Sequence, residues 1–114
     1  MTAQDKVNFS KYGKSFQEGL AALILQDRAF SDQIQEVLET EYFELKYLQV
    51  FVDRVFSYKQ KYNVHPTSKI LMTILRTELD DETDAVKKQT RDYFSRIYNT
   101  DIRDEGFIKN TSLD

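Results

Sequence analysis

Apolar residues recur every three or four positions along most of the chain, which is the period of an α-helix. Only three glycines and one proline interrupt the pattern. The strongest segment runs from about Lys46 to Tyr62, and its apolar face is wider than the roughly 100° stripe of an ordinary surface helix. We therefore predict a central helix here, whose inward residues are Leu48, Phe51, Val52, Val55, Phe56, Tyr58 and Tyr62.

Two shorter helices are predicted before the central one. Ser15 and Glu18 match the capping box, in which the serine side chain accepts from a free backbone N–H and the glutamate reaches back. We expect the first helix to begin at Ser15 and to end near Asp27 and Arg28, and the second to begin at Ser31. The segment "TEYFEL" then interrupts the pattern. The expected inward residues are Phe16, Leu20, Leu23 and Ile24, then Ile34, Val37 and Leu38.

Two further helices are predicted after it, from Thr67 to about Leu79 and from about Asp81 to Tyr98. The second has its acids at the start and its bases later, which complements the helix dipole. The sequence therefore predicts an all-α protein. The expected inward residues are Ile70, Leu71, Ile74 and Leu75 in one helix, and Val86, Tyr93, Phe94, Ile97 and Tyr98 in the other.

Composition narrows the class of protein. Of the 114 residues, 40% are hydrophobic and 31% charged, which is typical of a single globular domain. Cysteine is absent, so disulfides and thiolate sites are excluded. No apolar run approaches the roughly 20 residues that span a bilayer, and no signal peptide is recognisable, so we expect a cytoplasmic protein with no membrane contact. The net charge of −3 disfavours a surface devoted to DNA phosphates.

The stretch "KYNVHPTSK" contains the only histidine and the only proline. Asn63 suits the left-handed position after a helix, Pro66 forces His65 into an extended conformation, and Thr67 can cap the next helix. No second histidine and no cysteine exist to complete a metal site. We therefore interpret the stretch as a joint between helices and expect no bound metal.

Three other groups of side chains have a functional and a structural interpretation. Lys59, Lys61, His65 and Lys69 form a candidate basic patch for phosphate or an acidic partner, although a solvated face is the commoner outcome. The acids Glu78, Asp80, Asp81, Glu82 and Asp84 do not have EF-hand spacing, which favours a solvated helix start over a cation site. The aromatic residues fit core packing better than base stacking. No phosphate loop or other catalytic motif is present, so we expect no enzyme activity and no cofactor in this chain.

The segments "SFQEGLAALILQDRAFSDQI", "EYFELKYLQVFVDRVFSYKQKYNVHPTSKILMTIL" and "DEGFIKNTSLD" resemble, in this order, the N-terminal domain of DnaB-like replicative helicases, particularly their tailed-phage relatives. The resemblance covers nearly the whole chain after Tyr12. It depends on the "FQE" helix start, Phe30, the pair Tyr42 and Phe43, the apolar helix after them and the "YNVHPT" joint.

The resemblance implies a compact orthogonal bundle of about five to six helices, which helps to assemble a hexameric ring and contacts primase or a helicase loader in DNA replication. It implies a flexible arm over residues 1–14, a helical head over 15–99 and the start of a hairpin or linker helix over 100–114. ATP and magnesium would belong to a separate, later motor domain, and single-stranded DNA would pass through the ring of the full-length protein. The host would be a bacterial or phage-infected cell. The alternative is a small helix-turn-helix regulator that binds duplex DNA.

The last eleven residues contain Phe107, Ile108 and Leu113 at near-helical spacing. If the helicase hairpin begins here, these residues form a candidate self-interface, and the 114-residue chain is expected to be monomeric or weakly dimeric.

Overall fold

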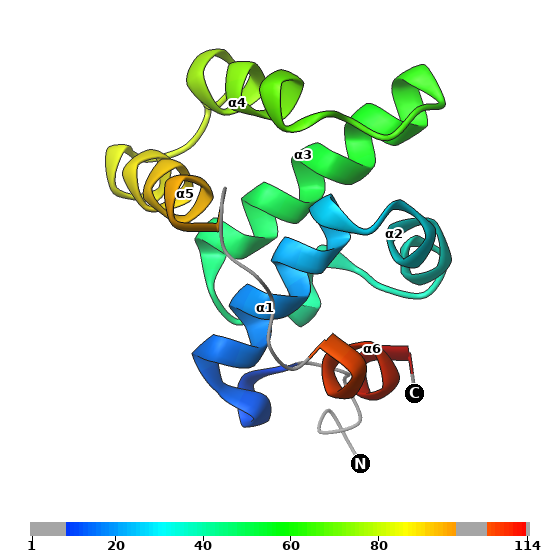
Figure 1. Cartoon of the computed structure of the whole chain (residues 1–114). Coiled ribbons are helices and arrows are strands. Elements are labelled where there is room, and N and C mark those ends of the chain that lie inside the picture. The colour runs from blue at the N-terminus through cyan, green and yellow to red at the C-terminus, as the bar shows by residue number, and fades with distance from the viewer. Residues whose placement is uncertain (1–8, 98–104, 114) are drawn as a thin grey trace.

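The computed structural model describes residues 9–97 and 105–113, and the regular elements of this part of the chain are all helices, with no strand (Figure 1). The all-α prediction is confirmed. The described elements are the 3-10 helices η2 (Ser10–Tyr12) and η3 (Thr40–Tyr42) and the α-helices α1 (Gly13–Gln26), α2 (Arg28–Gln35), α3 (Lys46–Tyr62), α4 (Ser68–Thr77), α5 (Asp84–Ile97) and α6 (Glu105–Leu113).

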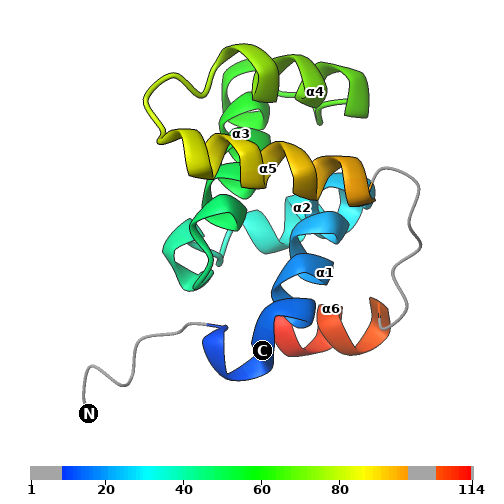
Figure 2. The same ribbon diagram turned by 90° about the vertical axis from the view of Figure 1, so that its left-hand side faces the viewer.

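Helix α3 is central, as predicted, and begins and ends at the predicted residues. It packs against α1, α4 and α5, and α5 lies across it (Figure 2). The Phe51 ring is fully buried and meets the Tyr93 ring edge-on, with 5.0 Å between the centroids. The apolar face is narrower at its C-terminal end than predicted, because Tyr58 is only half-buried and Tyr62 is 53% exposed.

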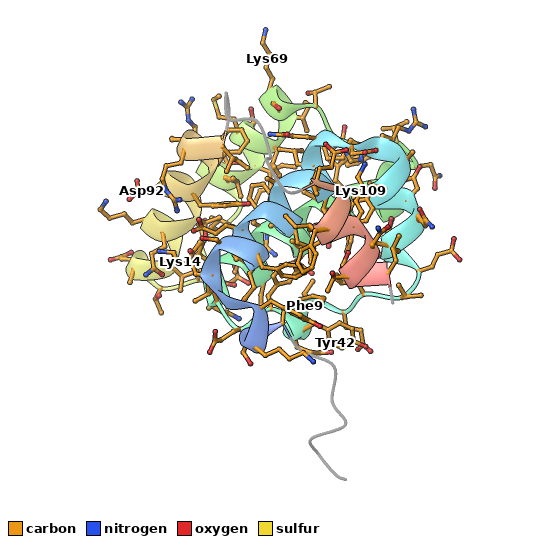
Figure 3. The ribbon with its side chains drawn as sticks, turned by 60° about the horizontal axis from the view of Figure 1, so that its bottom comes forward. Phe9, Lys14, Tyr42, Lys69, Asp92 and Lys109 are labelled. Carbon is orange, nitrogen blue, oxygen red and sulfur yellow. The ribbon has the colours of Figure 1, made fainter. Side chains whose placement is uncertain are left out.

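The first helix begins at Gly13 rather than at Ser15, and the predicted capping box is wrong. Ser15 is exposed inside α1, and no side chain caps this end. The chain before it is already fixed, because Phe9 is buried and its N–H donates to the Tyr42 carbonyl at 2.8 Å (Figure 3). The predicted flexible arm therefore extends too far, since residues 9–14 belong to the globule, while residues 1–8 lie outside the described part.

The start of α2 also differs from the prediction. Asp27 caps the helix by accepting from the Phe30 N–H at 3.1 Å, so α2 begins at Arg28. Ser31, the predicted cap, is instead fully buried within the helix. Ile34 and Leu38 are buried as predicted, but Val37 is 59% exposed because α2 has already ended at Gln35 and the turn rotates that side chain outward.

The joint between α3 and α4 has the predicted local structure. Asn63 adopts the left-handed conformation with φ of 60°, and the Thr67 hydroxyl accepts from the Ile70 N–H at 3.1 Å. Leu71, Ile74 and Leu75 are buried as predicted. Ile70 is 39% exposed, which contradicts the predicted inward position.

Helix α5 begins at Asp84, three residues after the predicted start, because the Thr83 hydroxyl accepts from the Val86 N–H at 3.2 Å and caps the helix there. Val86 is half-buried. Tyr93, Phe94 and Ile97 are buried as predicted, and Tyr98 lies outside the described residues.

Helix α6 packs against α1 and α2, at the end of the molecule opposite α4 (Figure 1). Ile108 is 5% exposed and belongs to the same core as α1 and α3. The last segment is therefore part of the globule and is not a separate projecting element in this structure. No helix in the described ranges is both long and apolar enough to cross a membrane.

Candidate functional site

The structure brings only part of the predicted basic patch together, because Lys59 and His65 line one pocket and Lys61 lines another. Lys59 is 8% exposed, and its ammonium donates to the Ser31 hydroxyl at 2.9 Å and pairs with Asp32 at 2.6 Å. This contact lowers the pKa of Asp32. Lys61 lies on another side of α3, and Lys69 extends into solvent from α4 (Figure 3). The Lys59 ammonium also lies 5.9 Å from the centre of the Phe56 ring, so its charge has three partners although the residue is buried.

His65 links the joint to the end of α1. Its Nε2 lies 2.6 Å from the Leu25 carbonyl, so Nε2–H donates to one of the carbonyls that the last turn of a helix leaves free. Nδ1 is buried and has no hydrogen-bond partner among the described residues. In the described ranges no group of three or more histidine, aspartate and glutamate residues could hold a metal ion. One ring nitrogen of His65 thus has a structural role, because it connects the joint to the end of α1.

The predicted acidic cluster is dispersed around the start of α5. Asp81 pairs with Arg54 at 3.4 Å, and Arg54 also pairs with Asp53 at 2.5 Å. Asp84 lies in the first turn of α5, where its charge favours the helix dipole. The contact with Arg54 ties the loop between α4 and α5 to α3 and gives Asp81 a structural role.

A polar network joins α1, α3 and α5 near the surface. The Glu18 carboxylate accepts from the Tyr47 hydroxyl at 2.5 Å and pairs with the Arg96 guanidinium through two hydrogen bonds of 3.0 Å. The buried Tyr93 hydroxyl donates to the Glu18 carbonyl. Burial raises the pKa of Glu18, but the hydrogen bonds from Arg96 and Tyr47 outweigh it and the net pKa is lowered. Burial and the neighbouring carboxylate raise the pKa of Tyr47 to about 12.

An open groove of about 270 Å³ lies between the C-terminal half of α3 and α4. This volume lies just below the range of about 300–1,000 Å³ that is typical of small-molecule sites. We call it the α3–α4 groove, and its lining residues are Arg54, Ser57, Tyr58, Lys61, Tyr62, Ile70, Thr73, Ile74 and Glu78.

The α3–α4 groove gathers apolar side chains that the core does not cover. Tyr62 and Ile70, which line it, are 53% and 39% exposed. Val64, 51% exposed, lies on the joint between them in sequence but lines a different pocket. The Tyr58 and Tyr62 rings lie 4.6 Å apart, and the Lys61 ammonium lies 5.3 Å from the centre of the Tyr62 ring. Apolar side chains that gather on a surface beside polar ones are a feature of protein-binding sites.

The predicted self-interface is only partly exposed. Phe107 is 61% exposed and touches Phe16 edge-on, with 6.2 Å between the ring centroids. Leu113 is half-buried, and Ile108 is buried in the core of its own chain. Ile108 therefore cannot contact a neighbour in this structure, which corrects the expectation for that residue.

Sequence reasoning missed both the polar network and the groove. Glu18 lies 29 positions before Tyr47 and 78 before Arg96, so no local pattern joins them. One feature of the sequence does indicate the groove: the predicted apolar face of α3 is wider than the stripe that an ordinary surface helix buries. Tyr58 and Tyr62 lie on that excess width.

Comparison with known proteins gives no further assignment: no family model, no curated protein and no solved structure matches the chain.

Proposed function

We propose that this chain is a protein-binding and assembly module of the kind found at the N-terminus of DnaB-like replicative helicases. In this role it would help to organise a hexameric ring and would contact primase or a helicase loader. ATP hydrolysis would occur in a motor domain encoded downstream. The chain itself would act by binding, without catalysis.

The observation that supports this proposal is the correspondence between sequence order and structure. The three segments that carry the helicase resemblance occupy α1 and α2, then η3 to α4, then α6, and all of them pack into one helical globule. The joint "YNVHPT" is the connection between α3 and α4, where exposed apolar side chains gather. A surface of this kind suits contact with another protein.

The charge distribution favours protein over DNA as the partner. The net charge is −3, and the predicted basic patch is divided, with Lys59 neutralised by Asp32. A helix-turn-helix regulator needs clustered cations that release counterions from duplex DNA. The described surface gives that alternative no specific support.

A binding measurement tests the proposal. The chain is immobilised, and the primase and helicase loader encoded in the same genome are passed over it, with expected dissociation constants of about micromolar. Duplex DNA at about 50 mM salt is the comparison and should not bind. Tight duplex binding with a steep salt dependence would overturn the proposal in favour of the regulator. The reading frame is also expected to encode a G-x-x-x-x-G-K phosphate loop downstream of this chain, and its absence would contradict the proposal.

A further inference from the structure

We propose that the α3–α4 groove binds one amphipathic helix of a partner protein, and that this helix runs parallel to α4. The inference deepens the partner-binding part of the proposed function and rests on it. Ring assembly does not depend on it.

The walls of the groove determine the kind of occupant. Tyr58 and Tyr62 lie one turn apart on α3, and Ile70 and Ile74 lie one turn apart on α4. Helix α4 crosses α3 (Figure 2), so the groove presents one pair of apolar side chains at helical spacing on each wall. Such pairs complement a third helix whose apolar residues recur at i, i+3, i+4 and i+7. Strand addition is unavailable here because both walls are helices whose backbone groups are already paired.

The two ends of the groove differ in charge. The joint connects the end of α3 to the start of α4, so Lys61 and Ile70 lie at the joint end. Away from the joint, Arg54 in the middle of α3 pairs with Asp81 in the loop after α4, and Glu78 also lines the groove there.

The charges at the two ends are available to a partner. Among the described residues, Lys61 and Glu78 form no ion pair, and both are exposed. An occupant therefore complements the groove when it places an acidic side chain at the joint end and a basic one at the far end.

This charge pattern also sets the direction of the bound helix. Acidic residues are favoured in the first turn of a helix and basic residues in the last, because of the helix dipole. The helix should therefore begin over Lys61 and end near Glu78. Since α4 starts at the joint and ends next to Glu78, the occupant runs in the same direction as α4.

Single-stranded nucleic acid is the competing occupant, because Tyr62 and Lys61 resemble a stacking platform. The carboxylates around the groove favour a peptide. Glu78 lines it, and Asp53 and Asp81 lie against Arg54, which neutralises the second cation. A phosphate backbone would meet these charges unfavourably.

The test uses synthetic peptides and amide NMR spectra of the whole 114-residue chain. The first peptide is a helix of about 14 residues with leucines spaced three and four positions apart, glutamates in its first turn and lysines in its last. The second has the glutamates and lysines exchanged. The first should shift the amide signals of Tyr62 and Ile70, and the second should bind about threefold more weakly.

Matched variants separate the groove from the rest of the surface. Tyr62→Ala should weaken the first peptide about tenfold, as for an anchor residue of an interface. Val37→Ser removes an equally exposed apolar side chain outside the groove and should leave affinity unchanged. Circular dichroism confirms that both variants remain helical.

The peptide experiments overturn the inference if they give no groove shift with either peptide at about millimolar concentration, equal affinity for both peptides, equal effects of the two variants, or larger groove shifts with an oligothymidylate. Groove shifts that depend on protein concentration alone would assign the groove to a second copy and also overturn it. If primase or loader binds and Tyr62→Ala leaves that binding intact, the groove assignment fails while the proposed function stands. If neither protein binds the unaltered chain, the proposed function fails.

Discussion

At the scale of single residues, Glu18 is a side chain whose contacts join three helices that lie far apart in the sequence. Its carboxylate accepts hydrogen bonds from Tyr47 on α3 and Arg96 on α5. Its backbone carbonyl accepts one from the Tyr93 hydroxyl, also on α5. Each of these contacts crosses between helices, so the network fixes how α1, α3 and α5 pack. Because the side chain is only 16% exposed, the charge needs these partners to remain ionised.

The lowered pKa of Glu18 predicts a pH dependence of stability. A carboxyl group with a lower pKa in the folded state stabilises the fold above its unfolded pKa, and this contribution is lost as pH falls through the folded value. The free energy of unfolding of the wild-type chain should therefore fall more steeply between about pH 5 and about pH 3 than that of Glu18→Gln. Urea denaturation at several pH values measures both slopes.

Glu36→Gln is the matched control, because Glu36 is exposed and has no ion pair with the described residues. It should keep the wild-type slope. Equal slopes for wild type and Glu18→Gln would show that the network does not favour the charged carboxylate.

At the scale of elements, α3 and α1 supply the largest shares of the core, whereas His65 makes a single hydrogen bond from the joint that follows α3. Phe51→Ala should cost about 3–5 kcal/mol, because it leaves a cavity against the buried Tyr93 ring. His65→Ala should cost about 1 kcal/mol, since it removes one hydrogen bond from a half-buried side chain. Urea unfolding followed by circular dichroism compares them. A larger loss for His65→Ala would contradict both the position of the core and the role of the joint.

Lys109 links α6 to the start of α2, so replacing its charge should loosen α6 locally. The Lys109 ammonium lies 2.5 Å from Asp27, 2.7 Å from Glu105 and 5.7 Å from the centre of the Phe30 ring. The hydrogen bond from Lys109 lowers the pKa of Asp27. Lys109→Met keeps most of the stem, so it should raise the Asp27 pKa and speed hydrogen exchange in α6 about two- to fivefold.

Carbon NMR titration of the Asp27 carboxyl group and amide exchange measure the two effects. Lys88→Met removes a charge of the same kind from a pair with Asp92 on α5 and should change neither quantity. An Asp27 pKa that stays the same in Lys109→Met would show that α6 is held by apolar packing alone.

The elements also show which features the sequence could predict. The limits of α3, the left-handed Asn63 and the Thr67 cap follow from local chemistry, and the structure confirms them. The starts of α1 and α2 were wrong because tertiary contacts of Phe9 and the side chain of Asp27 competed with plausible serine caps. The predicted burial of Ile70 was also wrong, because burial depends on tertiary contacts as well. Ile70 has the helical period of the apolar face of α4, but it remains 39% exposed.

At the scale of the whole molecule, exposed apolar side chains lie at different places on the surface. The α3–α4 groove belongs to one end, and α6 with Phe107 belongs to the other (Figure 1). A contact that joined one region to the other on a second copy would be heterologous and could close into a ring. Isologous contact through a single region would instead give a dimer. The size of each region decides how strong such contacts can be.

The last prediction concerns the oligomeric state of the 114-residue chain. Stable interfaces bury about 1,200–2,000 Å² in total. On α6, Phe107 is the exposed large apolar side chain, whereas Ile108 is buried in the core of the same chain. We therefore expect a monomer or a weak dimer at tens of micromolar, measured by light scattering after size exclusion. Phe107→Ser should lower any dimer fraction, and Val37→Ser, which removes an apolar side chain of similar exposure elsewhere, should not. A stable hexamer would show that these 114 residues alone can form a closed assembly, against this expectation. A dimer indifferent to Phe107→Ser would place the self-contact on another surface.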